Sequence, residues 1–291
     1  MEEMEKRYRM IKKVLWIILA ANFAVSIAKI IIGYITKSLS LSADGFHSFS
    51  DGASNIIGLI SITLAAKPID NEHPYGHKKI ETMASLIIGA MLVFITYNIV
   101  VQSIQKLSNQ SEIKVSFESV LILIITLVIN IFVAYYEKKQ GIKYNSSFLI
   151  ADSIHTKSDI FVSIGVLTTL ICIKIGLPPM IDVAVSIIVA GFILYAAYGI
   201  FKEAYNILID SKVLDEENIK DIVIKSFNNV KDVHKVRSRG GNDYIFLDMH
   251  IKVNPNLNVM EVHSLVHDIE NVIKVKDNRV IEIIVHVEPY K

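Results

Sequence analysis

Long apolar runs separated by short polar segments fill the first two thirds of the chain. Each run has about 20 residues, the length that an α-helix needs to cross the hydrocarbon core of a bilayer. Six such runs are found, at residues 14–35, 39–65, 83–101, 117–135, 150–175 and 180–200. The pattern predicts a membrane protein with a six-helix transmembrane bundle.

The last third of the chain has the pattern of a small folded domain. Two segments place apolar residues at helical spacing, and three alternate apolar and polar residues as half-buried strands do. The helical segments are 216–227 and 259–273, and the alternating segments are 233–239, 244–253 and 280–287. A Gly240-Gly241-Asn242 turn signal joins the first two strands. The order α-β-β-α-β predicts a three-stranded α+β domain with both helices on one face.

Basic residues gather on one side of the predicted membrane domain. With six spans, both termini and the loops after the second and fourth spans lie on that side, which the positive-inside rule assigns to the cytoplasm. These residues are Lys6, Arg7, Arg9, Lys12, Lys13, Lys67, Lys78, Lys79, Lys138, Lys139 and Lys143. We therefore expect a transmembrane domain over residues 1–205 and a cytoplasmic domain over 206–291, in a cell membrane (plasma or inner).

Composition narrows the class of protein further. The chain of 291 residues is 52% hydrophobic, which is too apolar for an ordinary soluble protein of this size. Its formal net charge is +1, so no broad basic surface indicates nucleic-acid binding. One cysteine, Cys172, rules out a disulfide framework or a thiolate metal cluster within one chain.

Two copies of one short pattern lie within the predicted spans. His47-x-x-x-Asp51 and His155-x-x-x-Asp159 each place an imidazole and a carboxylate on one helix face, because residues four apart lie above one another. Two facing helices would supply two nitrogen and two oxygen ligands to a divalent cation. Each residue alone is equally consistent with a hydrogen bond to a neighbouring helix. The matched pairs favour an intramembrane metal site.

Further candidate ligands lie in the cytoplasmic segments. The loop before the third span has Asp70, His73 and His77, a spacing that a turn running into a helix can close around one ion. The alternative is a polar turn followed by a helix-end cap. The tail histidines are scattered over strands and a helix. Taken singly, each is better interpreted as a surface or core histidine than as a metal ligand. The tail candidates are His234, His250, His263, His267, His286 and Glu288.

These segments together resemble the cation diffusion facilitators, a family of proton-coupled divalent-metal exporters. The resemblance rests on ADGFHSFSD at residues 43–51, HPYGH at 73–77, ADSIHTKSD at 151–159 and the histidine-bearing tail. It implies six spans, a ferredoxin-like, metallochaperone-type cytoplasmic domain and a homodimer.

The resemblance also implies roles for particular residues. The transport site falls on His47, Asp51, His155 and Asp159, and the loop site on Asp70, His73 and His77. A binuclear tail site falls on His234, His250, His263, His286 and Glu288, where the best-known bacterial members have aspartate at the last position. Lys79 and Asp210 match an ion pair between the two domains. The roles of Asn22, Asp44, Asn130, Asp152 and His267 stay open.

The expected function is export of a divalent metal from the cytoplasm in exchange for protons. Imidazole must be neutral and carboxylate ionised to bind a metal, so protons and metal compete for the same groups. Two imidazoles and two carboxylates favour Zn²⁺, with Co²⁺ and Cd²⁺ next and Fe²⁺ and Mn²⁺ as further candidates. We expect Zn²⁺ as substrate and regulator, and no catalytic cofactor.

Three other functions compete with transport by exchange. An intramembrane metallohydrolase is disfavoured because the sequence has no His-Glu-x-x-His motif, so we expect no enzyme. The other two alternatives are a membrane metal sensor or scaffold that does not transport, and a passive channel. Metal flux into vesicles, with and without a pH gradient, discriminates among them.

Overall fold

A computed structural model gives the structure of the chain and describes residues 2–35, 52, 54–108, 117–175 and 180–290. The chain divides into two compact units, Met1–Ala204 and Tyr205–Lys291. The first unit is helical, and the second contains a three-stranded sheet with two helices. A helical membrane domain followed by a small α+β domain is therefore confirmed.

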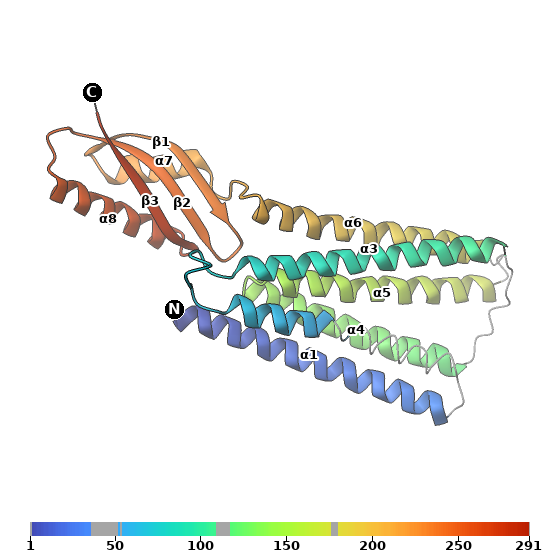
Figure 1. Ribbon diagram of the computed structural model, residues 1–291. Helices are drawn as coiled ribbons and strands as arrows, with labels where there is room; N and C mark the ends of the chain where they lie inside the picture. The colour runs from blue at the N-terminus through green and yellow to red at the C-terminus, as the bar shows by residue number, and fades with distance from the viewer. Residues whose placement is uncertain (1, 36–51, 53, 109–116, 176–179, 291) are drawn as a thin grey trace. The chain divides into compact units, whose positions relative to one another are not determined.

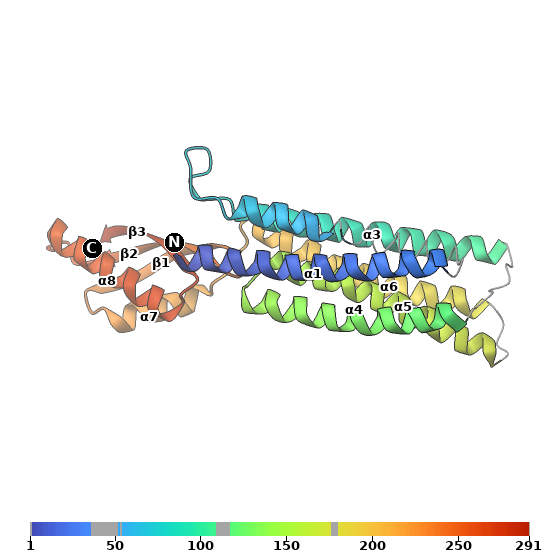
Figure 2. The same ribbon diagram turned by 90° about the horizontal axis from the view of Figure 1, so that it is seen from below.

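Long helices run side by side in the first unit (Figures 1 and 2). They are α1 (Glu2–Ile35), α3 (Lys79–Ser108), α4 (Phe117–Lys143), α5 (Ser147–Lys174) and α6 (Met180–Leu208), with a shorter helix at Ser54–Ala65. Two of the helices, α1 and α4, extend well beyond the predicted apolar runs. Lysine, arginine and glutamate are good helix formers, so α1 begins within the charged segment at Glu2 and α4 continues to Lys143.

Three stretches within the described helices are long and apolar enough to cross a membrane. They are Lys6–Ile27, Lys79–Gln105 and Val183–Leu208. Large aromatic side chains on the outside of the bundle are well exposed, including Phe94 (65%) and Phe132 (69%). Such exposure would be costly in water but is favourable against lipid.

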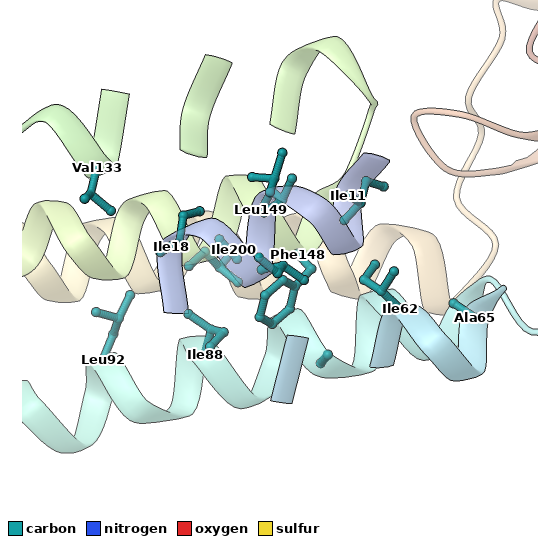
Figure 3. Packing of buried hydrophobic residues seen from close by; sticks show 14 of the residues in the cluster. Ile11, Ile18, Ile62, Ala65, Ile88, Leu92, Val133, Phe148, Leu149 and Ile200 are labelled. Carbon is teal, nitrogen blue, oxygen red and sulfur yellow. The ribbon is translucent and has the colours of Figure 1, made fainter. Parts of the chain in front are cut away.

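A core of aliphatic and aromatic side chains holds the bundle together (Figure 3). Its fully buried members come from α1, the helix Ser54–Ala65, α3, α5 and α6, and include Ile11, Ile62, Ile88, Leu92 and Phe148. Gly58 allows a close approach of two helices, because a Cβ atom placed there would lie 2.3 Å from the Phe148 ring. The short helix and α5 therefore depend on this glycine to pack together.

A polar network joins three helices at one end of the bundle. Arg7 in α1 donates hydrogen bonds to the carbonyl oxygens of Tyr144 (2.6 Å) and Asn145 (2.9 Å) in the turn between α4 and α5. Glu81 in α3 accepts hydrogen bonds from the Ser146 hydroxyl and from Arg7. The starts of α1 and α3 and the α4–α5 turn thus lie at the same end.

The second unit has the predicted element order. It contains α7 (Glu216–Ser226), β1 (Val230–Gly240), β2 (Ile245–Val253), α8 (Val259–Lys276) and β3 (Val280–Pro289) (Figure 1). β2 lies in the centre, antiparallel to β1 and parallel to β3. A capping box between Asn258 and Glu261 fixes the start of α8.

The sheet has one covered and one open face. Alternate residues of β2 from Ile245 to Val253 are buried and pack with residues of both helices, such as Val223 of α7 and Ile269 of α8. His250 lies between two of these buried positions and therefore points to the opposite face. Both helices cover the same face, as predicted, and the open face carries the histidines of the strands.

Candidate metal-binding sites

The intramembrane candidate residues of α5 lie on one helix face. Asp152, His155 and Asp159 are three and four residues apart, so their side chains follow one another along the helix. His155 is 3% exposed, and its two ring nitrogens have no hydrogen-bond partner among the described residues. The predicted ligands His47 and Asp51 lie outside the described residues.

A buried imidazole without partners is costly, because burial removes the hydrogen bonds that water would provide. A cation bound to one ring nitrogen would offset this cost. The environment of His155 is therefore suited to a metal ligand. The complete four-residue site stays a prediction.

A chain of polar residues reaches the same part of α5, and it contains Asn22 and Asp152, whose roles the sequence left open. The Asn22 amide of α1 donates a hydrogen bond to the Asn55 side-chain oxygen (3.0 Å), and the Asn55 amide donates one to Asp152 Oδ2 (2.8 Å). Asn55 and Asp152 are 1% and 0% exposed. The sequence signal for this chain of residues is that polar side chains occur in otherwise apolar helices. Which of them pair depends on how the helices pack.

Glu137 is a second buried carboxylate near this chain, and the sequence reasoning missed it. It lies in α4 just after the predicted span and is 1% exposed. The Thr156 hydroxyl donates a hydrogen bond of 2.8 Å to Glu137 Oε2. Thr156 follows His155 directly in α5. The acidic groups of α4 and α5 are thus close to one another inside the bundle.

The three loop candidates come together before α3. His73 Nδ1 lies 3.2 Å from Asp70 Oδ1, and His77 Nε2 lies 3.4 Å from Asp70 Oδ2. One potential ligand atom from each of the three lies within 4.8 Å of the others. Gly76 makes this possible, because its φ of +83° lets the chain turn between the two histidines.

Backbone hydrogen bonds prepare Asp70 as an anionic ligand. The amide groups of Glu72 and His73 donate to Asp70 Oδ1 at 3.1 and 2.7 Å. The bond from the His73 backbone is the main reason that the pKa of Asp70 lies below its ordinary value of 3.8. Asp70 and His73 are exposed, whereas His77 is buried. The loop can therefore take a cation from solvent.

A second cluster lies on the open face of the sheet. His234 of β1 is paired in register with His250 of β2, and Glu288 of β3 reaches both. Glu288 Oε1 accepts a hydrogen bond from His250 Nδ1 (2.9 Å), and Oε2 lies 3.4 Å from His234 Nε2. The glutamate at this position is therefore long enough to meet both imidazoles.

A β-bulge positions His234. The register shifts between His234 and Arg237, where β1 has one residue more than β2, and Lys235 has a φ of +50°. Bulges of this kind bend a strand and change the direction of the neighbouring side chains. Strand periodicity alone did not predict this irregularity.

The hydrogen bond from His250 lowers the pKa of Glu288 below its ordinary value of 4.5, with further lowering by His234. The carboxylate therefore stays ionised at neutral pH. Two imidazoles and one carboxylate with ligand atoms within 4.8 Å form a three-ligand set for a divalent cation. A four-coordinate cation bound by these three residues would have one position left for another ligand.

The other tail candidates lie in two different places. The His286 ring is 4.5 Å from the His250 ring, between centroids, so His286 borders the cluster. His263 lies on α8, which covers the opposite face of the sheet, and therefore does not join the cluster within one chain. It is instead next to His267, with 3.2 Å between the Nε2 atoms.

The ion pair predicted between Lys79 and Asp210 would join the two units, and it stays a prediction. Within its own unit, Asp210 lies 3.7 Å from Arg239. Its φ of +57° places it in the left-handed region just after α6.

Comparisons with known proteins match both units of the chain to cation efflux proteins. The family model of the cation efflux transmembrane domain matches residues 15–209, and that of the cation efflux protein cytoplasmic domain matches residues 214–290. The manganese efflux system protein MneP of Bacillus subtilis is 30% identical and covers 98% of this chain and 98% of its own. An uncharacterized transporter of Methanocaldococcus jannaschii is 31% identical, over 93% of this chain and 95% of its own. The cadmium, cobalt and zinc/H(+)-K(+) antiporter of Bacillus subtilis is 29% identical, over 88% and 79%.

Proposed function

Because this chain belongs to the cation diffusion facilitator family, we propose that it exports Zn²⁺ from the cytoplasm in exchange for protons. The chain is a metal-cation efflux transporter of a membrane and not an enzyme. Its partners are metal ions and a second copy of the chain, in keeping with a cytoplasmic domain of the dimerising type.

The observation that carries this proposal is the environment of His155. An imidazole that is 3% exposed and has no hydrogen-bond partner among the described residues lies four residues before Asp159 in the membrane domain. A transported cation needs such a site, which binds it away from water and releases it when the ligands take up protons. The second pair of ligands in the proposal is His47 and Asp51.

Zinc is proposed because imidazole and carboxylate ligands in a tetrahedron suit this ion. Manganese is the second candidate, because MneP is named as a manganese efflux protein and matches almost the whole chain. Mn²⁺ prefers oxygen ligands, and the buried carboxylates of Glu137 and Asp152 add oxygen near His155.

Proton exchange is proposed from the chemistry of the ligands. Neutral imidazole and ionised carboxylate bind metal, whereas their protonated forms do not, so a proton gradient can drive release. A relative at 29% identity is named as an H(+)-K(+) antiporter for cadmium, cobalt and zinc. We also propose a plasma or inner membrane as the location, with both termini in the cytoplasm. The basic residues at the helix ends support this orientation.

The two cytoplasmic clusters are proposed as sensors of the transported ion. The loop cluster around Asp70 and the sheet cluster around Glu288 each hold three ligand atoms within 4.8 Å of one another. Metal bound there would favour one arrangement of the dimer over another and so shift the population of transport-competent molecules.

Purified protein in proteoliposomes tests the proposal. Zn²⁺, Mn²⁺, Co²⁺ and Cd²⁺ uptake is measured with an ion-sensitive dye, with and without a pH gradient. We expect Zn²⁺ flux that depends on the gradient and is abolished by Asp159→Asn, while Ser163→Ala in the same helix keeps it. Flux that is independent of pH would indicate a channel, and no flux of any metal would contradict transport.

A further inference from the structure

Oxygen donors gather in the bundle one helical turn from His155. Asp152 precedes His155 by three residues of α5, about 4.5 Å along the helix axis. It lies nearer to the α4–α5 turn, the end of the bundle that the proposed function places in the cytoplasm. An ion that enters from that end would reach Asp152 before His155.

The Asp152 carboxylate is held by a strong hydrogen bond to one of its two oxygens. Its Oδ2 accepts the hydrogen bond from Asn55, whose own oxygen is occupied by Asn22. Its Oδ1 is buried and has no partner with hydrogen-bond geometry among the described residues, although the Ser54 side chain lies beside the carboxylate.

Within the described part of the chain, no lysine or arginine forms an ion pair with Asp152, which is 0% exposed. Burying an ionised carboxylate costs several kcal/mol unless it is paired or coordinates a metal. The two asparagines fix the orientation of the carboxylate but do not neutralise it. A cation bound at Oδ1 would neutralise the carboxylate.

We propose that Asp152 is an additional ligand for the transported cation, one turn before His155, and that its oxygen extends the substrate range to Mn²⁺. This inference rests on the proposed export function. Asn22 and Asn55 are positioning residues, because they hold one oxygen of the carboxylate so that the other stays available.

The surroundings of Asp152 favour an oxygen-preferring ion. Glu137 contributes another buried carboxylate, which interacts electrostatically with Asp152 and Asp159. Carboxylate, carbonyl and water ligands suit Mn²⁺, whereas Zn²⁺ also binds well to imidazole. Removing the Asp152 charge will therefore weaken Mn²⁺ transport more than Zn²⁺ transport.

Initial rates in proteoliposomes over a range of Mn²⁺ and Zn²⁺ concentrations test this. For Asp152→Asn, which keeps the size of the side chain and can still accept from Asn55, the KM for Mn²⁺ should rise by at least about tenfold, the loss typical of altered metal sites. The KM for Zn²⁺ should change much less. Ser163→Ala, a buried polar change elsewhere in α5, should leave both KM values unchanged.

Each of the following results would overturn the inference. Wild-type KM values for both metals in Asp152→Asn would show that the carboxylate does not meet the ion. Equal losses for both metals would assign it a structural role. A wild-type protein that transports neither metal would refute the export function itself, which separates that failure from the failure of this inference.

A second variant covers the case in which Asp152→Asn does not fold, judged by size-exclusion chromatography in detergent. Asp152→Glu keeps the charge and moves the carboxylate by one methylene, so it should change the ratio of the Mn²⁺ and Zn²⁺ KM values. An unchanged ratio in this variant overturns the inference.

Discussion

The Arg7 guanidinium in α1 lies 3.2 Å from the Glu81 carboxylate at the start of α3, and both side chains are largely buried, at 13% and 6% exposure. The same carboxylate accepts hydrogen bonds from the Ser146 hydroxyl and the Phe148 amide at the start of α5. One acidic side chain thus binds a cation from one helix and caps the first turn of another. This contact joins segments that are far apart in sequence.

Replacement of Glu81 by glutamine will destabilise the bundle. The change leaves Arg7 partly buried without its counter-charge, and breaking such a pair typically costs about 3–5 kcal/mol. We expect a clear fall in the thermal unfolding midpoint of the detergent-solubilised protein.

The control for this prediction is Arg9→Ala, since Arg9 is exposed two residues away in the same helix. Arg7→Ala combined with Glu81→Gln should be less destabilising than the sum of the single changes. Additive effects would mean that the two side chains stabilise the bundle independently.

A larger residue at Gly58 will separate the short helix from α5. The Gly58→Ala methyl would overlap the buried Phe148 ring, and overpacking of this kind costs about 1–3 kcal/mol. Phe148→Leu should partly rescue the variant by removing part of the ring. Thermal unfolding of the single and double variants measures this, and Gly191→Ala, where a Cβ meets nothing within 4 Å, is the matched control.

Asp70→Asn will weaken metal binding at the loop. The change removes the carboxylate that lies between His73 and His77, so the Zn²⁺ affinity of this site should fall by at least about tenfold. Equilibrium dialysis of the full chain against Zn²⁺ would then show fewer ions bound at low concentration. Glu72→Gln changes an exposed carboxylate in the same loop and should have no effect, and equal losses in both variants would argue against a defined site.

The stability of the metal-free cytoplasmic domain will decrease in acid through Glu288. The pKa of Glu288 is lower in the folded chain than its ordinary 4.5, because of His250 first and His234 next. Its stabilising contribution is therefore complete above the ordinary value and is lost as the pH falls through the lowered pKa. Glu288→Gln should make the unfolding temperature less sensitive to pH below about 5.

Differential scanning calorimetry of the full chain at several pH values measures this difference. Glu282→Gln, an exposed glutamate in the same strand, should keep the wild-type pH dependence. The same dependence in Glu288→Gln would show that other groups control acid unfolding.

Periodicity predicted the secondary structure of the cytoplasmic domain well, because it reports which face of each element is buried. The second helix was expected at residues 259–273 and ends at Lys276, and the first strand was expected at 233–239 and occupies Val230–Gly240. The sequence did not indicate the bulge at Lys235, since a single inserted residue leaves the overall alternation recognisable.

The sequence by itself determined the helical and strand segments, the chemistry of the candidate ligands and the likeness to a metal exporter. These properties depend on residue types and on spacings of a few residues, which backbone geometry converts directly into faces. Only the tertiary structure decided that Asn22 and Asn55 hold Asp152, that Arg7 pairs with Glu81, and that His263 lies across the sheet from His250. Such contacts depend on how distant elements pack, and the pattern within any one element does not specify them.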